Sequence, residues 1–146
     1  MIQFFRPEEE KLIIAAIRKA ESQTSGEIRV HIEQKPRGAI LREAKRIFQK
    51  LGMDDTKDRN GVLVVLAPEW KEFAIIGDEG IDAVVPDDFW DSERDLLQTY
   101  FRKGEFCAGL VAAIDVIGEK LKAHFPVQDD DENELSDDIS YGGKDR

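Results

Sequence analysis

Asn60-Gly61-Val62-Leu63-Val64-Val65-Leu66-Ala67-Pro68 is the stretch that decides the fold of this chain. Residues 62–67 form an unbroken apolar run of mostly β-branched or leucine side chains, with Asn-Gly and Pro, which favour turns, at its two ends. Such runs are typical of strands that are covered on both faces. The sequence therefore predicts a buried central strand over residues 62–67.

Two further strands are expected beside this one. Residues 72–77 follow it after a tight turn at 68–71, so they should return antiparallel to it. Residues 27–34 alternate, with apolar side chains on one face and polar ones such as His31 on the other, as in a half-buried strand. Because a helix-bearing connection separates this strand from residues 62–67, the two are expected to be parallel neighbours.

Apolar side chains at helical spacing predict about four helices. They are expected from Pro7 to Thr24, from Ile40 to Gly52, from Asp87 or Asp88 to Gly104, and through Leu110–Leu121 up to Pro126. Strands and helices together predict the α/β class, as an α/β/α-type sandwich. Its small mixed central sheet should hold two parallel strands plus an antiparallel return strand, covered by about four helices.

The chain divides into two parts by composition. With 146 residues, of which 41% are hydrophobic, it is long enough for one domain with its own core. We expect this domain over residues 1–126 and a disordered acidic tail over residues 127–146, because the tail has many acids and no apolar periodicity. Leu135, Ile139 and Tyr141 within the tail leave open a transient contact with a partner.

The acidic balance of the chain limits the classes of partner. Its formal net charge is −10 at pH 7, which disfavours binding to nucleic-acid phosphates and to anionic membrane surfaces. A single cysteine, Cys107, permits neither an intrachain disulfide nor a multi-thiolate metal site. The N-terminal stretch carries acids where a signal peptide would be apolar. We expect a monomeric cytoplasmic protein with no nucleic-acid or membrane partner.

Acidic side chains gather at one edge of the predicted sheet. The starts of the two parallel strands and the end of the return strand should meet there. Their acids are Glu27 at the first strand, Asp54, Asp55 and Asp58 before the central strand, and Asp78, Glu79 and Asp82 after the return strand. Carboxylates crowded in this way repel one another unless they are protonated, hydrogen-bonded or bridged by a cation.

Two interpretations of this acidic edge stay open. Ca²⁺ and Mg²⁺ take several oxygen ligands, often from loops, and the predicted ligands are Asp54, Asp55, Asp58, Asn60, Asp78 and Glu79. In the other interpretation, these residues only cap turns and helices at a solvated edge. Arg59 lies among them and is a candidate substrate contact for a phosphate group, although pairing with a neighbouring acid is the simpler expectation.

Three motifs, in their order and spacing, resemble the TPM domain family. They are Arg59-Asn60-Gly61-Val62-Leu63-Val64-Val65-Leu66, Ala74-Ile75-Ile76-Gly77-Asp78-Glu79-Gly80-Ile81, and Gly104-Glu105-Phe106 with Gly109-Leu110. The resemblance spans about residues 8–125. It implies an α/β sandwich, binding of a divalent cation, often calcium, by acidic loops, and the acid-phosphatase activity reported for some members. Many relatives are exported and carry Gly-Tyr-Gly-Leu-Glu from position 77, so this chain resembles a soluble cytoplasmic branch.

The sequence itself contains no complete catalytic set for a phosphatase. Ala113 stands six residues after Cys107, where a thiol-based phosphatase needs an arginine, and the central strand ends in Ala67-Pro68 rather than in a nucleophilic aspartate. We therefore predict a divalent-cation-binding domain, with metal-dependent hydrolysis of phosphomonoesters as its candidate activity and no assigned catalytic residue. The alternative is a non-enzymatic interaction module whose metal site only orders the acidic loops.

Overall fold

The strand β2, Gly61–Ala67, lies inside the sheet, and all seven of its residues are buried. The computed structural model describes residues 4–127 and 138–142. In it β2 pairs in parallel with β1, Glu27–Glu33, and antiparallel with β3, Glu72–Gly77. The predicted central strand and the directions of both neighbours are confirmed.

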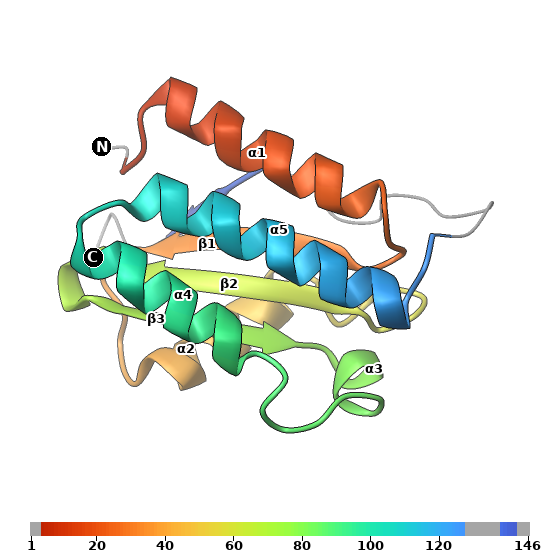
Figure 1. Cartoon of the computed structure of the whole chain (residues 1–146). Coiled ribbons are helices and arrows are strands. Elements are labelled where there is room, and N and C mark those ends of the chain that lie inside the picture. The colour runs from red at the N-terminus through yellow and green to blue at the C-terminus, as the bar shows by residue number, and fades with distance from the viewer. Residues whose placement is uncertain (1–3, 128–137, 143–146) are drawn as a thin grey trace.

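Helices cover both faces of this sheet (Figure 1). On one face lie α1, Pro7–Glu21, α4, Asp91–Arg102, and α5, Phe106–His124. On the other lies α2, Ile40–Lys50. A short helix α3, Glu79–Asp82, follows β3, and a 3₁₀ turn, Pro68–Trp70, joins β2 to β3. The α/β/α sandwich with a mixed sheet is therefore confirmed.

Two hydrophobic clusters explain why β2 is apolar along its whole length. Val62, Val64 and Leu66 belong to the larger cluster, which α1, α4 and α5 complete. Leu63 and Val65 belong to the smaller cluster beneath α2. Because successive side chains of a strand point to opposite faces, a strand between two helical layers must be apolar at every position.

A fourth strand is the main departure from the predicted fold. Residues Ser140–Gly142 form β4, which pairs in parallel with the last three residues of β1 and gives the strand order β3-β2-β1-β4. Our expectation of a disordered tail is wrong for residues 138–142, and its remaining residues, 128–137 and 143–146, lie outside the described part. The expectation of a half-buried strand is also wrong for β1, because six of its seven residues are buried. His31, which is 5% exposed, lies within hydrogen-bond distance of Ser140 in β4.

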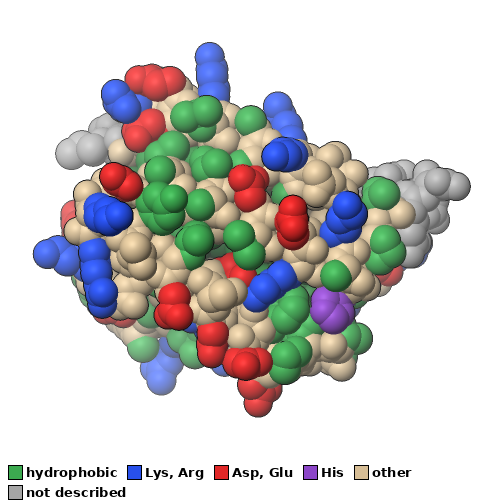
Figure 2. Space-filling view, viewed as in Figure 1, with side chains coloured by type: hydrophobic (Ala, Val, Ile, Leu, Met, Phe, Trp, Pro, Cys, Tyr) green, Lys and Arg blue, Asp and Glu red, His purple; other side chains and the backbone are tan. Residues whose placement is uncertain are grey.

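The surface over α1, α4 and α5 mixes acidic, basic and apolar side chains (Figure 2). The acidic excess of the chain is thus not gathered on this face. No helix within the described residues is long and apolar enough to cross a lipid bilayer. One boundary differs from expectation, since α4 begins at Asp91 and residues 86–90 form the turn before it.

Candidate functional site

The two acidic loops of the predicted edge meet in the structure. Glu27 lies opposite Gly61 and Gly77 opposite Val62 in the strand registers, so the segment before β2 and the segment after β3 emerge side by side. The amide of Gly80 donates a hydrogen bond to the carbonyl oxygen of Arg59 at 2.8 Å. The convergence that topology suggested is therefore real.

Arg59 joins these loops by ion pairs. Its Nε and Nη2 atoms donate to the two carboxylate oxygens of Asp78 at 2.7 and 3.0 Å, and its Nη1 atom lies 3.0 Å from Glu79. The hydrogen bond to Asp78 raises the pKa of Arg59, and the charges of Glu79 and Asp54 add to this effect. Two parallel bonds between guanidinium and carboxylate fix orientation as well as charge. Arg59 thus pairs with neighbouring acids, as the simpler expectation held.

Asp78 also begins a helix. Its carboxylate accepts a hydrogen bond from the amide of Glu79, the first residue of α3, at 2.8 Å, and so satisfies one of the free amides at the start of that helix. The next turn approaches the neighbouring loop so closely that a Cβ atom at Gly80 would lie 2.3 Å from the carbonyl oxygen of Asp58. Glycine at position 80 therefore allows α3 to pack on the loop that carries Arg59.

Three of the predicted ligands, Asp55, Asp58 and Asn60, do not converge with Asp78. Asp55 and Asp58 are exposed and do not line the groove described below, and the Asn60 amide donates to the hydroxyl of Ser25 at 3.2 Å. Among residues 4–127 and 138–142, no group of three or more His, Cys, Asp or Glu side chains is placed to hold a metal ion. The six predicted residues therefore do not form one ligand shell in this conformation.

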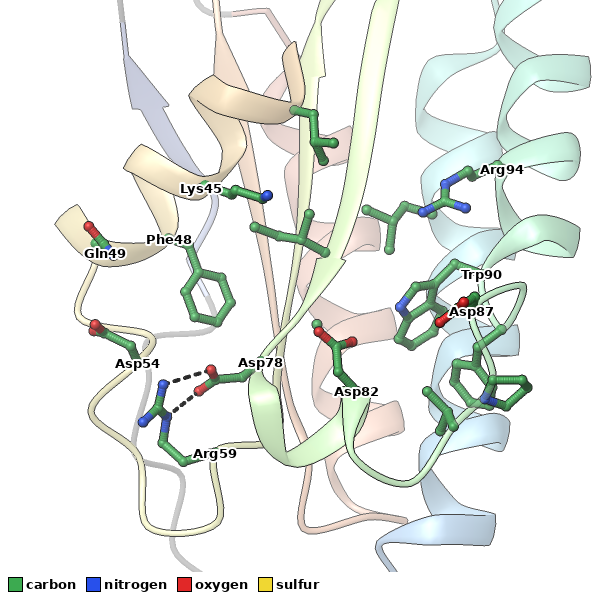
Figure 3. Close-up of a pocket in the computed structure, with 17 residues that line it drawn as sticks. Lys45, Phe48, Gln49, Asp54, Arg59, Asp78, Asp82, Asp87, Trp90 and Arg94 are labelled. Carbon is green, nitrogen blue, oxygen red and sulfur yellow. Dashed lines mark hydrogen bonds and ion pairs between the residues drawn. The ribbon is translucent and has the colours of Figure 1, made fainter. Parts of the chain in front are cut away.

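A groove of about 500 Å³ opens beside the Arg59–Asp78 pair (Figure 3). Its walls come from α2, β3, α3 and the turn before α4. Its charged lining residues are Asp54, Asp78, Asp82, Asp87, Lys45, Arg59 and Arg94. Four acids and three basic side chains thus face one space, with Phe48 and Trp90 as aromatic walls. The groove has the charges to bind a cation and an anion together.

Asp82 is the acid that points into this groove between Asp78 and Trp90 (Figure 3). Partial desolvation raises the pKa of Asp82, and the negative charges of Asp78 and Asp87 raise it further. Within the described residues, the carboxylates of Asp82 and Asp87 have no hydrogen-bond or ion-pair partner. The groove therefore holds negative charge that the protein itself leaves uncompensated.

Sequence reasoning placed Asp82 at this edge but did not name it as a ligand, and it did not assign Lys45, Asp87 or Arg94 to the site. A signal for Asp82 existed, because it lies four residues after the helix-capping Asp78 and hence on the same face of one helical turn. Asp87 and the two basic residues come from separate elements. Only the packing of those elements brings them together.

Comparisons with known sequences and structures find a matching family and similar folds. The sequence model described as the TPM domain matches residues 2–120. The NMR structure of the BA42 protein from the psychrophilic bacterium Bizionia argentinensis is similar, with a TM-score of 0.92 and 47% identity. That match covers 97% of this chain and 98% of the other. No curated protein matches the sequence significantly.

Two more distant structures share the fold alone. One is the N-terminal domain of a protein from P. gingivalis, with 18% identity, a TM-score of 0.68, and coverage of 83% of this chain and 78% of that one. The other is the N-terminal domain of the cg2496 protein from Corynebacterium glutamicum, with 14% identity and a TM-score of 0.65. It covers 93% of this chain and 80% of the other.

Proposed function

Because this chain belongs to the TPM domain family, we propose that its groove is a binding site for a divalent cation, Ca²⁺ or Mg²⁺. The observation that carries this proposal is the unpaired carboxylate of Asp82. It faces the groove near Asp78 and Asp87, and partial desolvation together with their negative charges raises its pKa. A cation bound beside Asp82 would relieve this repulsion.

The site that fits these residues is open and rich in water. No three described carboxylates can ligate one ion, and Arg59 already neutralises Asp78 through two hydrogen bonds. Asp82, helped by Asp87, would therefore hold the ion while water fills most of its coordination shell. Mg²⁺ in particular keeps several waters and is often bound through one or two carboxylates. We expect weak binding, in the millimolar range typical of sites with few protein ligands.

A titration of the purified chain with CaCl₂ or MgCl₂, followed by backbone amide NMR shifts, tests this site. Residues 78–82 and 87 should shift, and Asp82→Asn should weaken the fitted affinity at least about tenfold. Asp55→Asn is the matched control, because Asp55 is an exposed acid outside the groove lining, and it should leave the affinity within about twofold. Equal losses in both variants would indicate a diffuse charge effect and would contradict the proposal.

Metal-dependent hydrolysis of phosphomonoesters is the second candidate function, and one feature of the groove favours it. Lys45 and Arg94 project into the groove that Asp82 enters (Figure 3), and Lys45 has no ion-pair partner among the described residues. Such groups can contact phosphoryl oxygens. A bound cation would supply an activated water and charge stabilisation. The groove lining contains no Ser, Thr, Cys or His among the described residues, so the chain itself offers no such nucleophile there.

Turnover of a generic phosphomonoester separates this activity from simple cation binding. If the groove is catalytic, activity should fall with a chelator, with Asp82→Asn and with Lys45→Ala, while Lys50→Ala, on an exposed position outside the groove, should retain it. A chain that binds the cation without any turnover would instead support a non-enzymatic module whose cation orders the loops.

A further inference from the structure

The strand β4 occupies the outer edge of β1 through few backbone contacts. Among the described residues, three residue pairs form its ladder, from His31 opposite Ser140 to Glu33 opposite Gly142. One more backbone bond follows, from the Gln34 amide to the Gly142 carbonyl oxygen at 3.0 Å. A three-residue strand is at the short limit for globular proteins. Its position must therefore depend on side-chain recognition.

Each residue from 139 to 142 is recognised by a separate feature of the domain. Ile139 is 9% exposed and joins the larger core cluster. The Ser140 hydroxyl lies 2.7 Å from Nδ1 of His31. The Tyr141 hydroxyl bonds to the carboxylate of Glu10 on α1, and burial together with this contact raises the Tyr141 pKa.

The fourth position has no free space for a side chain in this arrangement. A Cβ atom on Gly142 would lie 2.4 Å from Oε1 of Glu33 and 3.0 Å from Nε2 of His31. These two groups cannot easily move aside, since they bond to each other at 3.1 Å and their side chains are 2% and 7% exposed. The edge of β1 thus selects an apolar residue, a serine, a tyrosine and a glycine in this order.

We propose that the β1 edge is a peptide-binding site for an extended Ile-Ser-Tyr-Gly segment. Residues 139–142 fill it from within the chain, and the same segment of a second copy can fill it between chains. Addition of a strand to a sheet edge combines backbone hydrogen bonds with side-chain pockets for specificity, and this site has both. A second copy is the occupant that we infer, because it carries the identical segment and so meets all four requirements.

The tether to residues 139–142 sets the concentration at which this exchange occurs. A segment that belongs to the same chain competes with an effective concentration on the order of 1 mM. Wild-type chains should therefore exchange strands only near about 1 mM, whereas a chain whose own strand is displaced should bind the free segment at or below about 1 mM.

Displacement of β4 by Gly142→Val in the full-length chain provides the test. Isotope-labelled Gly142→Val protein is titrated with a synthetic peptide of residues 137–146, and the amides of His31, Ile32 and Gln34 are followed by NMR. We expect saturable shifts at these residues. The same peptide with the Gly142→Val change, and wild-type protein given the unmodified peptide, should show at least about tenfold weaker effects. Gly38→Ala, at a glycine with open space around it, is the control for a glycine change as such.

Two results would overturn the proposal. One is the absence of shifts at the β1 edge at 2 mM peptide, roughly twice the effective concentration of the tethered segment. The other is equal binding of the valine peptide. If Gly142→Val protein does not fold, Tyr141→Ala is used instead, because it removes the contact to Glu10 without adding atoms at the β1 edge. Light scattering near 1 mM should detect a wild-type dimer that Gly142→Val abolishes, and peptide binding without this dimer would overturn the second copy as the occupant.

Discussion

Charged and polar groups have different surroundings at the two ends of β1. At its start, Asp82 and Asp87 are exposed on neighbouring segments, while Arg59 holds the buried Asp78 by paired hydrogen bonds. At its end, His31 and Glu33 are buried beside β4 and bond to each other. Near water, uncompensated charge can be screened or can bind an ion, so the first end suits exchangeable ligands. Away from water each polar group needs a specific partner, so the second end selects a defined segment.

The largest loss of stability should come from adding a side chain at Gly80, where the two loops near the start of β1 pack together. In Gly80→Ala the added Cβ would lie 2.3 Å from the Asp58 carbonyl oxygen and within 3 Å of the Arg59 backbone, so backbone must move. We expect a loss of about 2–3 kcal/mol in the free energy of unfolding, or about 5–10 °C in melting temperature. Thermal unfolding by circular dichroism measures it. Gly38→Ala, where nothing lies within 4 Å of the added atom, should change little, and equal losses in both would show that the two loops are not tightly packed.

An intermediate loss of stability is expected when the pH is lowered, because of His31 at the buried end of β1. Burial lowers the pKa of His31, opposed by its hydrogen bond and charge interaction with Glu33, while the charges of Arg29 and Arg46 lower it slightly more. The folded state then binds fewer protons than the unfolded state, whose His pKa is near 6.5, so stability falls as pH drops below about 6.5. Chemical denaturation at pH 7.5 and 5.5 should show this loss, together with faster amide exchange at Tyr141. In His31→Gln the His31 part of the pH dependence should vanish, and a pH dependence identical to that of the wild type would contradict this assignment.

The smallest effect on stability should come from Asp82 near the exposed end of β1, and its pH dependence should be opposite to that of His31. Desolvation and the charges of Asp78 and Asp87 raise the pKa of Asp82, so the folded state binds this proton more tightly than the unfolded state. Stability should therefore decrease as pH rises through that pKa. Without metal at pH 7, Asp82→Asn should stabilise the fold by less than about 0.5 kcal/mol, because solvent screens an exposed group. The gain should disappear at pH 3, and a gain that persists there would have a cause other than charge.

Some of these features followed from local sequence pattern. The run from Val62 to Ala67 predicted a strand buried on both faces, and the tight turn after it predicted the antiparallel β3. The helix-bearing connection predicted that β1 is parallel to β2. Strand directions alone then placed the loops before β2 and after β3 at one edge, where the structure has Arg59 and Asp78 bonded. Periodicity and connection length carry this information because they depend on residues close in sequence.

The sequence pattern did not predict β4, because its recognition is spread over distant residues. Ser140 meets His31 across 109 positions and Tyr141 meets Glu10 across 131. An acidic segment with few apolar residues has the composition of a disordered tail. A sheet edge with a matching surface can still hold four of its residues, since the edge supplies contacts that the segment lacks by itself.

By itself, then, the sequence determined the layers of the sandwich and the end of the sheet at which the acids gather, because both depend on side-chain period and on chain direction. Only the tertiary structure decided which acids face a common groove. Asp78 forms an ion pair with Arg59, whereas the carboxylates of Asp82 and Asp87 have no partner among the described residues. The physical reason is distance: an ion pair or a ligand shell depends on separations of a few ångströms, and the packing of α2, α3 and the turn before α4 sets those separations.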